Sequence, residues 1–141
     1  MIDLIAESLD EQELAEMYAT DDPSVRPRSS WPAWKDEGSD AAACYFEIPP
    51  GCSLGPHVHD AEESVVILAG RATATIGGER KALEGPALVV MPEGVTHDLT
   101  NEGDDTLRAV GYFPRNSVTT TFEQEMQPNG SRTAGTPDSA A

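Results

Sequence analysis

Short alternations of apolar and polar residues fill the middle of the chain and predict β-strands. In residues 41–48, Cys44, Phe46 and Ile48 alternate with their neighbours, and a Pro-Pro-Gly turn follows. Similar strand-like stretches occupy residues 64–70, 71–76, 79–83, 87–91, 96–100, 106–113 and 118–122. About nine short strands with little helix predict an all-β sandwich or barrel.

The N-terminal part of the chain lacks this alternation. Ser8 and Glu11 have the spacing of a helix capping box, which predicts a short N-terminal helix over residues 9–19. Residues 20–40 are rich in proline, serine and aspartate and predict an irregular connector.

Two indoles interrupt the polarity of the connector. We expect Trp31 and Trp34 to anchor it on the barrel, with a role as a pocket lid as the alternative. Residues 124–141 hold almost no aliphatic side chains and predict a disordered tail. The predicted organisation is a helix and connector over 1–40, a barrel over 41–123 and a tail over 124–141.

The composition limits the partners of the chain. With 141 residues it fits one domain, and its net charge of −16 argues against nucleic acids and anionic membranes as partners. No apolar run approaches the ~18 residues of a membrane span, and the N-terminus lacks the pattern of a secretory signal, so we expect a cytoplasmic protein. Cys44 and Cys52 fit no zinc or redox spacing and are expected to be reduced.

All three histidines of the chain fall in one candidate metal site. On an extended strand His57 and His59 point to the same face, roughly 6.6 Å apart at their Cα atoms. Glu63 has the same parity after a short bend, and His97 follows a Pro-Glu-Gly turn that can bring it back. Three imidazoles and a carboxylate suit a divalent transition metal, with iron or manganese favoured and zinc, nickel or copper as alternatives.

The same residues carry a family resemblance. The first motif of the cupin superfamily is matched without a mismatch by Gly51, His57, His59, Glu63 and Gly70. The second motif is matched by Pro92, Gly94, His97 and Asn101, with Gly85 one residue further from the proline than usual. The resemblance is to single-domain cupins. It implies a cupin-type jelly-roll β-barrel that holds one metal ion through His57, His59, Glu63 and His97.

The resemblance leaves three functions open. The first is a dioxygenase-type oxidoreductase acting on a small enolic or phenolic compound, in which Glu63 is a ligand and a catalytic proton acceptor. The second is a redox-neutral isomerase, lyase or polyketide-cyclase-like enzyme. Many cupins, including some lyases, carry a tyrosine where Val65 stands, so a lyase would need Tyr45 or Tyr112 instead. The third is a binder of small ligands without catalysis.

Two further expectations concern the barrel itself. Ala72 and Ala74 share one face of a predicted strand, and their small side chains are expected either to leave space in the cavity or to fit the taper of the barrel. We also expect the chain to form a homodimer.

Overall fold

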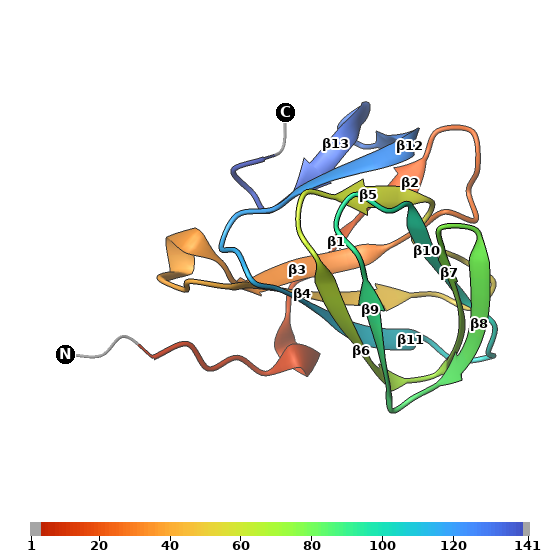
Figure 1. Ribbon diagram of the computed structural model, residues 1–141, viewed down its shortest axis with the longest axis horizontal. Coiled ribbons are helices and arrows are strands. Elements are labelled where there is room, and N and C mark those ends of the chain that lie inside the picture. The colour runs from red at the N-terminus through yellow and green to blue at the C-terminus, as the bar shows by residue number, and fades with distance from the viewer. Residues whose placement is uncertain (1–3, 140–141) are drawn as a thin grey trace.

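The computed structural model describes residues 4–139, which form two antiparallel sheets facing each other (Figure 1). The first sheet has, in spatial order, β1 (Ala15–Glu16), β3 (Arg28–Ala33), β4 (Ala42–Ile48), β11 (Leu107–Phe113), β6 (Glu63–Ala69) and β9 (Ala87–Met91). The second has β13 (Ser131–Gly135), β12 (Thr119–Gln127), β5 (His57–His59), β10 (His97–Asn101), β7 (Arg71–Ile76) and β8 (Glu79–Glu84), and β2 (Tyr18–Ala19) pairs with β12. The predicted all-β jelly-roll barrel is confirmed.

Alternation along the strands builds the core between the two sheets. On β4, Cys44, Phe46 and Ile48 point inward, and on β6 Val65 and Ile67 do the same. Complete burial of a side chain such as Ile67 contributes about 1.5–3 kcal/mol to the free energy of folding. This core spans both sheets and holds the strands that carry the histidines in a fixed register.

The prediction of an N-terminal helix over residues 9–19 is wrong. Only Leu9–Glu11 is helical, as a single 3₁₀ turn, and the Ser8 side chain makes no cap hydrogen bond. Ala15 and Glu16 pair with β3 instead. An isolated helix of this length is only marginally stable. Pairing with the open edge of β3 satisfies the backbone hydrogen-bonding groups instead, and the rest of the sheet supports it.

The connector expected over residues 20–40 is only partly irregular. Six of its residues form β3, and Lys35–Glu37 form a second 3₁₀ turn. Trp34 is buried in the core, as expected of an anchor, while Trp31 is partly buried and packs on Phe113 with ring centroids 5.8 Å apart.

The disorder expected for the C-terminal tail is not found in residues 124–139. There β12 continues to Gln127, and β13 pairs back onto it. The hydroxyl of Thr136, which is fully buried, accepts the N–H of Val118 at 3.0 Å and donates to Asp138 at 2.6 Å. Backbone pairing and polar contacts therefore order a segment whose low aliphatic content predicted disorder.

The outer face of the first sheet carries an exposed apolar surface. The outer patch, as we call it, consists of Val66, Leu68, Leu88, Val90 and Tyr112 on the neighbouring strands β6, β9 and β11. Leu88 is the most open of the five, at 63% exposed. Among residues 4–139, no helix has the length and apolar character needed to cross a membrane.

Candidate metal centre

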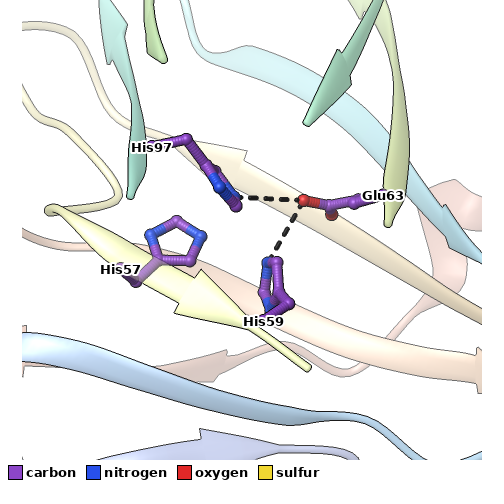
Figure 2. Close-up of side chains that lie close together, drawn as sticks. All are labelled: His57, His59, Glu63 and His97. Atoms are coloured by element: carbon purple, nitrogen blue, oxygen red, sulfur yellow. Dashed lines mark ion pairs between the residues drawn. The ribbon is translucent and has the colours of Figure 1, made fainter. Parts of the chain in front are cut away.

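Four buried side chains converge inside the barrel (Figure 2). His57 and His59 come from alternate positions of β5, His97 from the start of β10, and Glu63 from the start of β6 in the facing sheet. Because His97 pairs directly with His57 across β5 and β10, the two rings lie together, with centroids 4.2 Å apart. The structure therefore brings together all four residues that the sequence predicted.

The donor atoms lie close enough to share one ion. One ligand atom from each of the four residues lies within 4.8 Å of the others. Oε1 of Glu63 faces Nε2 of His59 at 3.2 Å and Nε2 of His97 at 3.4 Å. The carboxylate thus completes a set of four donor groups with the three imidazoles.

Contacts on the far side of each ring fix the direction of the imidazoles. Nδ1 of His57 lies 2.6 Å from the carbonyl oxygen of Gly55, and Nδ1 of His97 lies 3.2 Å from that of Val95. A carbonyl oxygen only accepts, so Nδ1 carries the proton and Nε2 keeps its lone pair in both rings. Nδ1 of His59 lies 2.8 Å from the hydroxyl of Thr120.

The chemistry of this donor set fits a metal ion. Nε2 of His59 and Nε2 of His97 are buried, and apart from their approach to the Glu63 carboxylate they have no hydrogen-bond partner within residues 4–139, although such atoms are normally satisfied in a protein interior. Burial lowers the pKa of His57 to about 3, with a smaller contribution from the repulsion between protonated rings at His57, His97 and His59, and this keeps the ring neutral. Burial by itself raises the pKa of Glu63, but without a metal, hydrogen bonding and positive charge from His59 and His97 rings protonated at Nε2 outweigh it and lower the pKa to about 2. Neutral imidazoles and an ionised carboxylate are the forms that bind transition metals.

Gly111 on β11 makes room for the carboxylate. A Cβ atom at this position would lie 1.9 Å from Oε2 of Glu63 and 2.9 Å from its Cδ. The residue faces the barrel interior, between Ala109 and Phe113. Only glycine at position 111 lets the Glu63 side chain reach its position opposite the histidines.

A mainly apolar pocket opens beside the donor atoms. It has a volume of about 210 Å³, and His57, His59 and Glu63 form part of its wall. The rest of the wall includes Met17, Trp31, Phe46, Leu54, Phe113 and Phe122. A metal ion at this centre would therefore be reachable by a small organic molecule.

Several residues singled out in the sequence lie elsewhere. Ala72 and Ala74 are buried in the core and do not line the pocket, which favours their fit to the barrel taper over cavity space. Tyr45 is buried with its hydroxyl 2.7 Å from Glu47, and Tyr112 belongs to the outer patch. Neither tyrosine lines the pocket, so neither can take the place of the tyrosine that many cupins carry at the position of Val65.

Both cysteines are free, as expected, and they have different surroundings. Cys44 lines the pocket, and its burial, with the nearby Glu63 carboxylate, raises the pKa of its thiol well above the usual range. Cys52 packs beside the core. The Asn101 side chain has a structural role, since its amide donates to the carbonyls of Ile48 and Asp105, both at 2.8 Å.

Sequence reasoning missed several residues around the centre. Thr120 and Phe122 on β12 and Met17 near the N-terminus come from segments without a metal motif. Gly111 did carry a signal, because a glycine inside a strand often marks a close approach of another group.

Comparison with known proteins identifies the family. The family model of the Cupin domain matches residues 44–113, about half of the chain. None of the curated protein sequences matches significantly.

Among solved structures, a polyketide cyclase from Streptomyces resistomycificus is similar with a TM-score of 0.66 and 19% identity, over 86% of this chain and 88% of that one. A protein from Acidithiobacillus ferrooxidans, described as a sugar phosphate isomerase without proof of that activity, has a TM-score of 0.65 and 19% identity. The match covers 84% of this chain and 79% of that one. The oxalate decarboxylase of Lactobacillus farciminis has a TM-score of 0.65 and 18% identity over 69% of this chain, which spans only 31% of that protein. These likenesses concern the fold, and together with the sequence match they show that the chain belongs to the cupin family.

Proposed function

We propose that this cupin is a metal-dependent oxidoreductase of the dioxygenase type, acting on a small enolic or phenolic compound. The observation that carries the proposal is a buried set of three histidines and one glutamate that forms part of the wall of an apolar pocket. A centre used only for structure would be sealed by the protein, whereas this one faces space for a ligand.

The residues of the chain have separate roles in this proposal. The ion would be held by His57, His59, Glu63 and His97. Because Glu63 is ionised with a low pKa, it suits the role of a metal ligand better than that of a proton acceptor. A bound divalent ion would supply Lewis acidity toward a hydroxyl oxygen and, if redox-active, electron transfer to O2. The catalytic role predicted for Glu63, as acceptor of the hydroxyl proton of the substrate, stays a proposal that rests on its place in the pocket wall.

A second candidate is a redox-neutral reaction of the polyketide-cyclase kind. It is supported by the similar fold and length of the polyketide cyclase and by the aromatic wall of this pocket. The wall would exclude water and hold a ring system, while the Glu63 carboxylate would take the proton that leaves an acidic carbon or hydroxyl group.

Oxygen uptake distinguishes these candidates. Protein reconstituted with Fe(II) or Mn(II) is mixed with catechols, flavonols and cyclic 1,3-diketones, and both O2 and substrate are followed. We expect substrate loss with matching O2 consumption, absent in the His57→Ala/His59→Ala variant. Substrate loss without O2 consumption would instead establish the redox-neutral reaction, and ligand binding without any turnover would leave a binding protein.

The outer patch supports a homodimer, which we propose as the assembly of this chain. The outward side chains of β6 and β9 within the patch include no carboxylate, although the chain carries 25 acidic residues. Two chains of net charge −16 repel each other least through such a face, and its burial removes exposed apolar area from water.

Sedimentation velocity tests this assembly. We expect the wild-type protein to sediment with twice the mass of one chain, and the Leu88→Lys/Val90→Lys variant to sediment as a monomer. Ala82→Lys, a substitution at an exposed position of β8, is the matched control and should remain dimeric. A wild-type monomer at high protein concentration would contradict the proposal.

A further inference from the structure

Aromatic side chains form a continuous wall from the pocket interior to the donor atoms. Trp31 packs on Phe113 with ring centroids 5.8 Å apart, and Phe113 packs edge-on against His59 at 4.9 Å. On the other side, Phe122 lies 5.2 Å from His57. A flat ring next to the centre would meet aromatic surface along this path, and such contacts are worth about 0.5–1.5 kcal/mol beyond the burial of apolar area.

The charges in the wall limit the charge of the ligand. Among the pocket-lining residues within 4–139, Glu63 is the single charged side chain, and no lysine or arginine is present. Imidazoles that bind a metal are neutral, so three of them and one carboxylate contribute a charge of −1, and a divalent ion would leave the centre with a net charge of +1. One anionic oxygen balances that charge. A second anionic group would be placed in apolar surroundings without a counter-ion, which is costly.

The walls of the pocket come largely from segments outside the shared cupin domain. The family match covers residues 44–113, which include the four donor residues. Met17, Pro27 and Trp31 precede it, and Thr120, Phe122 and Ala134 follow it. The cupin domain thus supplies the centre, while the N-terminal and C-terminal strands of this chain supply much of the surface that a ligand meets.

We propose that the pocket selects a flat aromatic ligand with a single negative charge on its donor oxygens, and that Trp31 is its main specificity residue. This inference rests on the proposed function, since it requires a ligand-accessible metal at His57, His59, Glu63 and His97. The volume of about 210 Å³ lies below the ~300 Å³ at which drug-sized sites begin, so a ligand of one or two rings fits best. Small dianions such as oxalate are excluded by charge.

Three chelators separate the contributions of ring and charge. Tropolone is a flat aromatic monoanion, acetohydroxamate is a monoanion without a ring, and oxalate is a dianion without a ring. Their binding to the Mn(II)-loaded protein is measured by titration calorimetry, which needs no catalytic turnover, and is expressed relative to the affinity of each chelator for free Mn(II). On this scale we expect tropolone to bind at least about tenfold more tightly than acetohydroxamate, and oxalate to bind most weakly.

Variants of Trp31 then test its role. Trp31→Ala should weaken tropolone binding roughly tenfold and leave acetohydroxamate binding unchanged, whereas Trp31→Phe should retain most of the tropolone affinity. Metal content and unfolding midpoint are measured for each variant, and the ranking of chelators on the wild-type protein tests the inference even if a variant fails to fold. Oxalate binding as tightly as tropolone would overturn this inference and leave the proposed function standing. The same holds if Trp31→Ala weakens the binding of all three chelators equally. If no chelator binds the loaded protein, the proposed function fails, and the inference fails with it.

Discussion

Replacing both His57 and His59 by alanine is expected to lower the bound metal from about one equivalent per chain to nearly none. The two rings supply half of the four donor groups, and the remaining Glu63 and His97 come from different sheets. Two donors do not hold a transition metal against buffer and cellular competitors. The measurement is metal analysis of protein purified without added metal.

The same variant should remain folded, because the core does not depend on the donor residues. The buried cluster of apolar side chains includes Phe46, Ile67 and Leu107, and none of the four donor residues belongs to it. A metal present at 1,000 times its dissociation constant stabilises the native state by about 4 kcal/mol. The variant should therefore unfold cooperatively at a lower temperature than the loaded wild type, and close to the temperature of chelated wild type.

Val58→Ala is the matched control for this experiment. Val58 lies between the two histidines on β5, with its side chain on the opposite face of the strand. The control should keep a full equivalent of metal. If the double-histidine variant also keeps a full equivalent, the assignment of the centre is wrong; if chelation unfolds the wild type outright, the ion is structural.

Gly111→Ala is expected to weaken metal binding by roughly 10- to 100-fold, the range typical of changes beside metal ligands. The new methyl group would lie 1.9 Å from Oε2 of Glu63, much closer than any van der Waals contact, so the carboxylate has to move away from its present position. The backbone at position 111 belongs to a regular strand, which alanine adopts without difficulty. The effect should therefore act through Glu63 rather than through β11.

A double-mutant cycle distinguishes this mechanism from general damage to the barrel. Glu63→Ala removes the group with which the methyl collides, so adding Gly111→Ala to it should cost little further metal affinity. Metal affinity is measured by competition with a chromophoric chelator, and the unfolding midpoint of each metal-free variant is measured alongside. Additive losses in the cycle, or wild-type affinity in Gly111→Ala alone, would show that Gly111 does not position the carboxylate.

Local errors in the sequence predictions have a common physical origin. The helix expected over residues 9–19 was inferred from a local capping motif, and the disorder expected over 124–141 from local composition. In the structure, Ala15 pairs with Ser29, and Thr119 pairs with Gly135, so partners elsewhere in the chain decide the conformation of these segments. A strand at a sheet edge takes its stability from its neighbour, which local composition does not reveal.

The sequence by itself determined the donor set, because the two-residue period of a strand places His57 and His59 on one face and a turn before His97 returns the chain. The motif spacing also predicted the barrel. Only the tertiary structure decided what surrounds the donors: Thr120 reaches His59 from 61 residues away, and Gly111 leaves space for Glu63. The pocket wall likewise joins Trp31 to Phe113 across a long stretch of chain. Such contacts depend on which strands become neighbours and in what register, and the pairing of distant segments is set by the packing of the whole core.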